Sequence, residues 1–165
     1  MPFYSTDQRK AVEAFVGDRY NARLEEIGAL LEREVAPKAK EVDQGAIFPR
    51  EAIALLAREG VIGLSFPKEF GGEELPFLVY AAAVELVSKA CASTSVSIAI
   101  HNTVCNGVHS FGSTDLQERF LPSLVKGERL GCFALTESGS GSDAGAMRTE
   151  AVLGGRVRPE RLQAL

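Results

Sequence analysis

The chain has 165 residues, which is enough for about one ordinary domain with a real hydrophobic core. Hydrophobic residues make up 45% and charged residues 24%, close to the averages of globular proteins, and this excludes disordered and collagen-like chains. The 18 basic and 22 acidic side chains give a net charge of −4, which argues against a nucleic-acid surface and leaves room for a local site that binds a small anionic molecule.

The cysteines Cys91, Cys105 and Cys132 lie within apolar stretches. No Cys-x-x-Cys pair or His/Cys cluster accompanies them, so the sequence predicts no metal site and no disulfide framework, but buried reduced thiols in a cytoplasmic protein. The first residues lack the basic and apolar regions of a signal peptide, and the longest apolar run, 76–84, is too short to span a bilayer. We therefore expect a soluble cytoplasmic protein with no membrane segment.

The N-terminal part of the chain has a helical pattern. Ser5 followed three residues later by Gln8 is a capping box, which predicts a helix that starts there and stops near Gly17. A longer helix is predicted from about Asp18, and Pro37 is expected to kink it rather than end it, because 36–42 remains helix-friendly. The residues expected to face inward are Val12, Phe15 and Val16 in the first helix, and Leu24, Ile27, Leu31 and Val35 in the second.

A third helix is predicted over 50–59. Pro49 stands at its start, where a missing amide costs little, and Gly60 is a natural left-handed cap. The segment 61–75 has no regular pattern and is either a ligand-facing loop or a connector packed on the core, of which the connector is favoured. The residues expected to pin it to the core are Val61, Ile62, Leu64 and Phe70.

The next two predicted helices span 76–92 and 95–110. The first is almost wholly apolar and is expected to be buried nearly all round. In the second, an apolar stripe lies opposite a stripe that holds His101 and Asn102. A lone histidine in an apolar helix is more often a hydrogen-bonded structural residue than a ligand, so neither His101 nor His109 is assigned a chemical role. The apolar stripe consists of Val96, Ile100, Val104, Val108 and Phe111.

A last helix is predicted to start with a second capping box, Thr114 with Gln117, and to end at Pro122 and Gly127. Its inward residues are expected to be Leu116, Phe120, Leu121 and Leu124. The predicted fold is therefore mainly α, an up-and-down orthogonal bundle of about six helices, followed by a first β-strand at 130–135 and a Gly/Ser loop.

The Gly/Ser loop offers close backbone approach and hydroxyl donors, which suits a phosphate or the polar edge of a ring. On spacing alone, a plain connector with Gly and Ser serving only the turns is favoured. The run Gly139-x-Gly141-x-x-x-Gly145 misses the Rossmann spacing by one residue, and no Gly-Lys-Ser/Thr of a P-loop is present. Asp143 stands where a nucleophile elbow needs Ser.

One run of this loop matches a family signature. Phe133-Ala134-Leu135-Thr136-Glu137-x-Gly139-x-Gly141-Ser142-Asp143 closely resembles the flavin-binding signature of the acyl-CoA dehydrogenase family. Upstream, Phe48-Pro49-Arg50-Glu51 and Pro67-Lys68-Glu69-Phe70-Gly71-Gly72 agree with the family in order and spacing. The resemblance covers about 22–152.

The resemblance implies an N-terminal helical domain, a middle β-domain and a C-terminal four-helix bundle. It also implies the family activity, in which FAD oxidises the Cα–Cβ bond of an acyl-CoA thioester and an electron-transferring flavoprotein takes the electrons. By position, 1–128 would be the helical domain, 129–154 the start of the β-domain with the flavin loop, and 155–165 a divergent tail.

The resemblance also assigns contacts. Phe133, Leu135 and Thr136 would line the flavin ring, with the Thr136 hydroxyl at its polar edge, where a hydrogen bond stabilises the reduced flavin. Gly141 and Ser142 would meet the FAD pyrophosphate, and Ser142 would also touch the CoA part of the substrate.

Three neighbouring residues in the loop qualify this assignment. Ser138 replaces the usual Pro and Ser140 the usual Ala, and since both changes are small the loop is still expected to form. Glu137 is expected to be structural, because the family's catalytic base is a Glu of the C-terminal bundle. No residue of this chain is therefore assigned as catalytic.

The C-terminal segment 155–165 departs from the family. Codons exist that encode 155–164 in this frame and, read one base later, encode Gly-Gly-Tyr-Val-Leu-Asn-Gly-Ser-Lys, the segment expected of the family. We hypothesise a frameshift that truncates the chain and leaves it inactive alone. The alternative is a non-catalytic helical interaction module or an expressed remnant. Exposed apolar faces of the two helices 76–92 and 95–110 would favour homo-oligomers.

Overall fold

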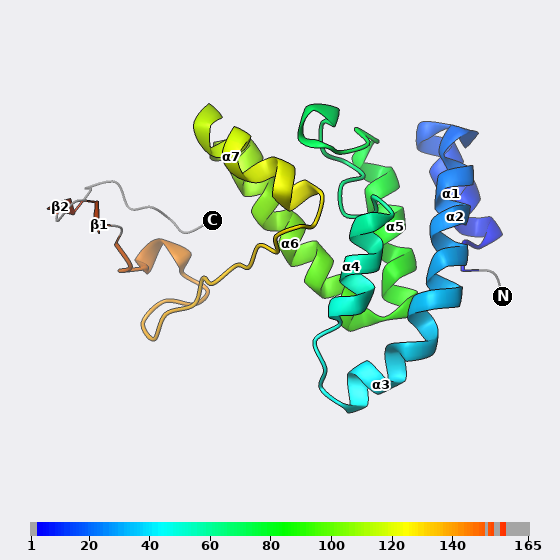
Figure 1. Cartoon of the computed structure of the whole chain (residues 1–165), viewed down its shortest axis with the longest axis horizontal. Helices are drawn as coiled ribbons and strands as arrows, with labels where there is room; N and C mark the ends of the chain where they lie inside the picture. Colours follow the sequence, from blue (N-terminus) through cyan, green and yellow to red (C-terminus); the bar gives the residue numbers. More distant parts are fainter. Residues whose placement is uncertain (1–2, 151, 154–155, 158–165) are drawn as a thin grey trace. The chain divides into compact units, whose positions relative to one another are not determined.

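The computed structural model describes residues 3–150, 152–153 and 156–157. These residues fall into two units, the first ending at Gly131 and the second starting at Cys132. The predicted mainly helical fold is confirmed, and the α-helices lie in the first unit (Figure 1). Within the described ranges, no helix has both the length and the apolar character needed to cross a membrane.

The first unit consists of α-helices with short 3₁₀ or π turns between some of them. The α-helices are α1 (Thr6–Val16), α2 (Asn21–Leu30), α3 (Ala39–Gln44), α4 (Arg50–Arg58), α5 (Phe77–Ala90), α6 (Ala92–Phe111) and α7 (Thr114–Val125). The turns are Asp18–Tyr20, Leu31–Val35, Ala36–Lys38 and Lys68–Phe70. In the second unit, β1 (Val152–Leu153) pairs antiparallel with β2 (Arg156–Val157), after a 3₁₀ turn at Ala144–Ala146.

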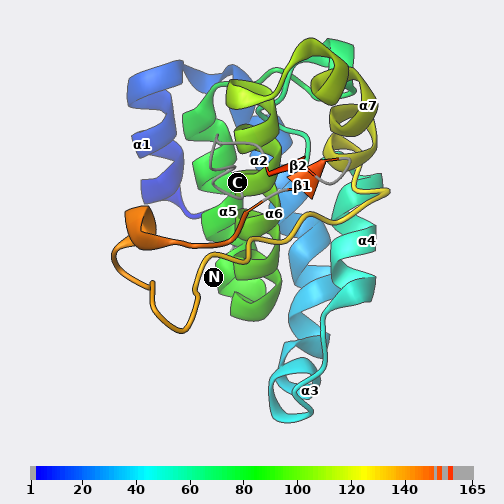
Figure 2. The same cartoon turned by 90° about the vertical axis from the view of Figure 1, so that its left-hand side faces the viewer.

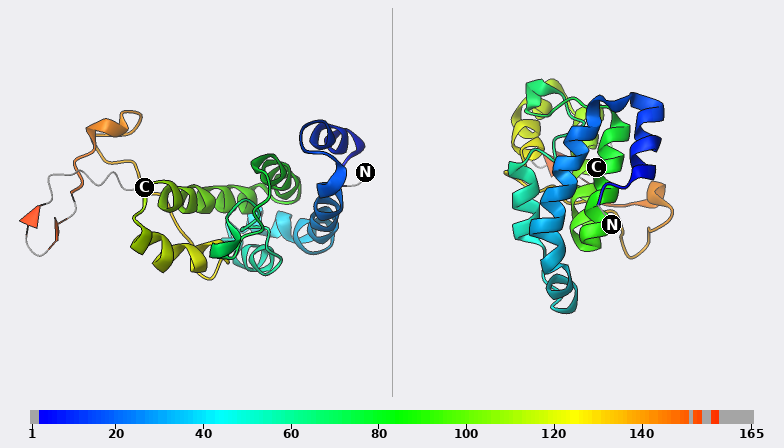
Figure 3. Two further views of the ribbon diagram at one scale, coloured as in Figure 1. Left: turned by 90° about the horizontal axis from the view of Figure 1, so that it is seen from above. Right: turned by 90° about the vertical axis from the view of Figure 1, so that its right-hand side faces the viewer.

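The start of α1 follows from its capping box. The Ser5 hydroxyl accepts from the Gln8 amide, and the Gln8 side chain accepts from the Ser5 amide at 3.0 Å, which confirms the prediction. Val12 is buried as expected, but the predicted inward position of Phe15 is wrong, since Phe15 is 80% exposed. The reason is position, because α1 lies at one end of the helical unit and α7 at the other, so α1 covers α5 with a narrow face (Figure 3).

The second predicted helix is continuous through Pro37, as expected for a kink. Pro37 has no amide hydrogen to donate, and the chain around it changes from α geometry to the π turn Leu31–Val35 and the 3₁₀ turn Ala36–Lys38. The α3 helix then extends beyond the other helices (Figure 2). The predicted apolar stripe is buried along its whole length, through Leu24, Ile27, Leu31 and Val35.

Gly60 ends the α4 region with a φ of 74°, the left-handed cap that the sequence predicts. The connector that follows is packed, with Ile62 and Leu64 fully buried. The prediction that the next helix is buried nearly all round is wrong, because α5 packs on α2 and α6 from one side and leaves Phe77 and Leu78 exposed.

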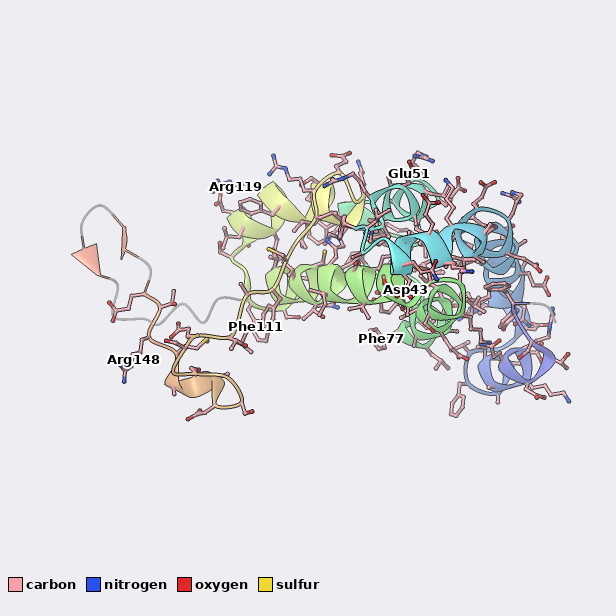
Figure 4. All side chains as sticks on the ribbon, turned by 90° about the horizontal axis from the view of Figure 1, so that it is seen from below. Asp43, Glu51, Phe77, Phe111, Arg119 and Arg148 are labelled. Atoms are coloured by element: carbon pink, nitrogen blue, oxygen red, sulfur yellow. The ribbon has the colours of Figure 1, made fainter. Side chains whose placement is uncertain are left out.

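Helix α6 buries its polar stripe and exposes much of its apolar one. His101 and Asn102 are each 1% exposed, whereas Val96 and Phe111 are largely exposed. Figure 4 labels Phe77 and Phe111, which stand out from α5 and α6. The physical reason is that the buried polar side chains find backbone partners on neighbouring segments, which offsets their loss of water.

Three predictions for α7 are corrected. The N-cap is Ser113, whose hydroxyl accepts from the Leu116 amide, and not Thr114. The helix also continues through Pro122 to Val125, because the group left without a donor is the carbonyl of Glu118, an exposed residue that water can reach. Leu116, predicted to face inward, is exposed, while Leu121 and Leu124 are buried as expected.

The predicted strand at 130–135 is wrong, because the segment is extended without pairing to any described strand. An isolated strand leaves its amides and carbonyls without partners, so an apolar run alone does not make one. Burial of all three thiols is also corrected, since Cys132 is exposed while Cys91 and Cys105 are buried. The divergent tail predicted at 155–165 lies outside the described residues except for 156–157, which form β2.

Candidate functional site

The Gly/Ser loop closes on itself by backbone hydrogen bonds. The Glu137 amide donates to the Ser140 carbonyl at 2.8 Å, and the Ser140 amide returns a bond to the Glu137 carbonyl at 3.2 Å. Ser138 and Gly139 form the tip of this tight turn. The loop therefore forms despite the two substitutions at Ser138 and Ser140, as the sequence predicts.

Ser140 supports the turn from inside. It is 5% exposed, and its hydroxyl donates to the Asp143 carbonyl at 2.7 Å. A buried hydroxyl is stable only with such a partner, so Ser140 fixes the residues that follow the turn. The structure thus gives a structural role to the position where the family usually has Ala.

Glu137 holds the loop to the segment that follows it. Its carboxylate accepts from the Thr149 hydroxyl, from the Arg148 amide at 2.8 Å and from the Thr149 amide at 2.9 Å. These bonds, the Thr149 hydroxyl foremost, lower the pKa of Glu137 below its ordinary value of 4.5. A carboxylate engaged in this way orders the chain around it and is a poor proton acceptor.

The residues assigned to the cofactor lie together in the second unit. Phe133 and Thr136 are exposed and Leu135 is half-buried on the extended segment before the turn, and Gly141 and Ser142 are exposed after it. Within the described residues, the hydroxyls of Thr136 and Ser142 make no hydrogen bond, which leaves both available to a ligand.

Two glycines of the loop, Gly139 and Gly141, face open space. A Cβ placed on Gly139 or Gly141 would meet no atom within 4 Å, so none of the described residues crowds the backbone there. Open glycines beside free hydroxyls allow the close backbone approach that a phosphate needs.

A second polar cluster surrounds His101 inside the helical unit. Its Nε2 lies 3.0 Å from the Leu124 carbonyl, and its Nδ1 accepts from the Gly131 amide at 2.9 Å. The predicted structural role of His101 is confirmed by these two bonds. Burial lowers the pKa of His101, partly offset by the Leu124 carbonyl.

Cys105 completes that cluster. Its Sγ is 3.4 Å from His101 Nε2, and burial raises the pKa of the thiol to about 12. Sequence reasoning missed this pair, although the spacing of four residues on one helix was a usable signal. The bond to Gly131 has no sequence signal, since thirty residues separate the two positions.

A groove lies between two helices of the helical unit. It has a volume of about 900 Å³ and runs between α3 and α4, with Ile47 and Phe48 at its side and Cys91 and Thr94 in its lining. None of the residues assigned to the cofactor lines it. Among the described residues, no group of three or more His, Cys, Asp or Glu side chains could hold a metal ion.

The family model described as acyl-CoA dehydrogenase, N-terminal domain, matches residues 9–128. The chain belongs to the acyl-CoA dehydrogenase family. It is 38% identical over 125 residues to the short-chain specific acyl-CoA dehydrogenase of Clostridium acetobutylicum, covering 75% of this chain and 33% of the relative. It is 39% identical over 122 residues to the acryloyl-CoA reductase (NADH) of Anaerotignum propionicum, covering 74% and 31%.

Solved structures agree with this membership. The butyryl-CoA dehydrogenase of Megasphaera elsdenii has a TM-score of 0.74 and 31% identity, covering 80% of this chain and 36% of that one. A chain in a structure described as the electron transferring flavoprotein of Acidaminococcus fermentans has a TM-score of 0.77 and 31% identity, covering 82% and 36%. This chain spans about a third of the length of the curated relatives it matches.

Proposed function

We propose that this chain supplies the N-terminal helical domain and the first part of the flavin site of an FAD-dependent acyl-CoA dehydrogenase, an enzyme that oxidises the Cα–Cβ bond of an acyl-CoA thioester. Family membership supports the reaction class, and the Gly/Ser loop supports the site. The single observation that carries the site is the open loop, with free hydroxyls at Thr136 and Ser142 on either side of a self-supported turn.

The extended segment before the turn suits the ring of the cofactor. Phe133 and Leu135 offer apolar surface to an aromatic ring system, and the Thr136 hydroxyl is free to donate to its polar edge. When bound, FAD supplies the hydride acceptor for the reaction. A hydroxyl donor at Thr136 would stabilise negative charge that develops on the ring.

The residues after the turn suit the phosphates. Gly141 leaves its amide open to close approach, and the Ser142 hydroxyl adds a second donor. We assign both to the FAD pyrophosphate, and Ser142 also to the CoA part of the substrate. Glu137 is engaged with Thr149, so it orders the loop and is given no part in proton transfer.

The proposed partners follow from the same assignment. The substrate would be an acyl-CoA, and the electrons would pass to an electron-transferring flavoprotein, a protein named in one matching structure. A homologous acryloyl-CoA reductase supports a substrate with a short acyl chain, and it supports reduction as well as oxidation of the acyl-CoA. We place the protein in the cytoplasm and expect it to form homo-oligomers.

Titration of the isotope-labelled chain with FAD, followed by amide chemical shifts, tests the site. At 17.7 kDa the chain is small enough for residue-by-residue assignment, and this method detects weak binding. We expect shifts confined to Phe133–Ser142, with riboflavin reproducing those of 133–136 and ADP those of 141–142. Ser142→Ala should raise the dissociation constant of FAD about tenfold, the effect of one charge-assisted hydrogen bond.

Ser110→Ala is the matched control. Ser110 is an exposed serine near the end of α6, and its replacement should leave FAD binding unchanged. Millimolar FAD that shifts no amide of the loop, or shifts that gather in the helical unit, would contradict the proposed site.

A further inference from the structure

The imidazole of His101 joins separate parts of the helical unit at one buried point. Its own helix is α6, its Nε2 lies against the carbonyl of Leu124 in α7, and its Nδ1 accepts from the amide of Gly131. Gly131 is the last residue of the helical unit, and the segment with Phe133 starts directly after it. His101 therefore holds the residue from which the chain leaves for the flavin loop.

The two hydrogen bonds define the protonation state of the ring. Nδ1 accepts from an amide, so it carries no proton, and Nε2 must carry the proton that it donates to the Leu124 carbonyl. Nε2 is also 3.4 Å from the Sγ of Cys105. Only the neutral ring with its proton on Nε2 satisfies both backbone partners.

We propose that His101 is a positioning residue for Gly131, the residue directly before the segment of the flavin loop: a latch that fixes Gly131 only while the imidazole is neutral, so that the backbone conformation at Gly131 depends on pH. The part of this inference that concerns flavin rests on the proposed function, whereas the latch itself does not.

Protonation would reverse the bond to Gly131. A proton on Nδ1 would point at the Gly131 amide, and two donors cannot hydrogen-bond each other. The ring is 1% exposed, so the new charge would also be buried. Both effects release Gly131 and remove the anchor of the segment that follows.

Apart from the Leu124 carbonyl, the groups around the ring offer the charge no compensation. From α6 the facing titratable group is Cys105, whose pKa of about 12 keeps it a neutral thiol. Tyr80 of α5 lies near Cys105, and burial raises its pKa also. The partners from α7 and from the segment before Cys132 are backbone groups, and no described ion pair includes His101. Burial therefore sets the pKa of His101 below its ordinary value of 6.5.

Two substitutions separate the two functions of the ring. In His101→Asn, the amide oxygen can take the place of Nδ1 and accept from Gly131. In His101→Gln, the amide nitrogen can take the place of Nε2 and donate to Leu124, but the acceptor for Gly131 is lost. Both variants replace the ring by a smaller amide, so they form a matched pair for packing.

The direct test is a nuclear magnetic resonance measurement on the whole chain without flavin. In the wild type, a scalar coupling between the Gly131 amide nitrogen and Nδ1 should be present at about pH 7.5 and should disappear as the ring is protonated below pH 6.5. Gly131 should lose about tenfold of its protection from hydrogen exchange in His101→Gln, and His101→Asn should retain it without the pH dependence.

The flavin part has its own readout. His101→Gln should shift the amides of 132–136 and weaken FAD binding several-fold, and His101→Asn should restore both. Equal loss of Gly131 protection in the two variants, or absence of the coupling, would overturn the latch. An intact latch with FAD binding unchanged in His101→Gln would overturn the positioning role. Failure of the wild type to bind FAD would contradict the proposed function, while the coupling still decides the latch.

Discussion

The guanidinium of Arg23 in α2 lies 2.6 Å from the carboxylate of Glu73, which stands in the irregular connector before α5. A second donor of Arg23 reaches the same carboxylate at 3.3 Å. The guanidinium also donates to the carbonyl of Glu59, just beyond the end of α4. One side chain thus joins α2, the end of α4 and the connector, which lie far apart in sequence.

Arg23→Ala should therefore lower the free energy of unfolding by about 1–3 kcal/mol, because it leaves the Glu59 carbonyl and the Glu73 carboxylate without their donor. The Arg23 side chain is 25% exposed, so water screens part of the pair and the upper end of this range is a limit. Urea unfolding at neutral pH measures the change.

Arg33→Ala is the control for charge and helix propensity. Arg33 pairs with its neighbour Glu34 at the surface, and such a pair contributes little. A shift of more than about 0.5 kcal/mol in this control, or none in Arg23→Ala, would show that the contact with Glu59 and Glu73 is not a source of stability.

Two substitutions in α1 test which face of this helix is buried. Val12 is 4% exposed, so Val12→Ala should cost about 1–3 kcal/mol through lost burial and the cavity left behind. Phe15→Ala removes a much larger side chain, but since Phe15 is 80% exposed the cost should stay within about 0.5 kcal/mol. Thermal unfolding of the two variants at the same protein concentration measures both costs. A larger loss in Phe15→Ala than in Val12→Ala would contradict the assignment of the buried face.

These results show which features a sequence can predict. The capping box of Ser5 and Gln8 and the stripe from Leu24 to Val35 depend on residues within one or two turns, and both are found in the structure. The failure at Phe15 is of another kind. Whether a helix covers its neighbours with a wide or a narrow face depends on where it lies in the unit, and periodicity does not contain that information.

Non-local partners explain the other failures. The buried face of α6 is polar because His101 and Asn102 bond to Leu124, Gly131 and Ile62, and no local pattern identifies those backbone groups. For the candidate site, the resemblance assigned the cofactor residues, and that assignment stays a prediction. It did not predict the bonds of Glu137 to the residues near Thr149, because these depend on how the loop turns.

Two glycines should differ in how much their replacement by Ala destabilises the fold. A Cβ on Gly72 would lie 2.1 Å from the Phe66 carbonyl oxygen, an atom already fixed by the Glu74 amide at 2.9 Å. Gly72→Ala should therefore cost about 2 kcal/mol or more, since the connector must shift. Gly139→Ala meets no atom within 4 Å and should leave the urea midpoint unchanged. Equal midpoints for the two variants would contradict this contrast.

Glu137 should keep the loop closed in mild acid. Its pKa is lowered because the carboxylate accepts from Thr149 and Arg148, so the bonds persist below pH 4.5 and are lost only as the pH falls through the lowered value. The Thr149 amide resonance should move with a midpoint below 4.5. Glu137→Gln removes that titration, and a midpoint at or above 4.5 in the wild type would show that the bonds do not favour the charged form.

The exposed apolar side chains of α5 and α6 predict self-association. Phe77 is 66% exposed, Phe111 75% and Val96 62%, and large exposed residues of this kind drive contacts between proteins. Sedimentation velocity should show species above 17.7 kDa, and replacing Phe77 and Phe111 together by Ser should shift the equilibrium at least about tenfold towards monomer. Asn106→Ser, an exposed polar change on α6, is the matched control. A single 17.7 kDa species at all concentrations would contradict the prediction, because it would show that the exposed side chains of α5 and α6 make no contact between copies of the chain.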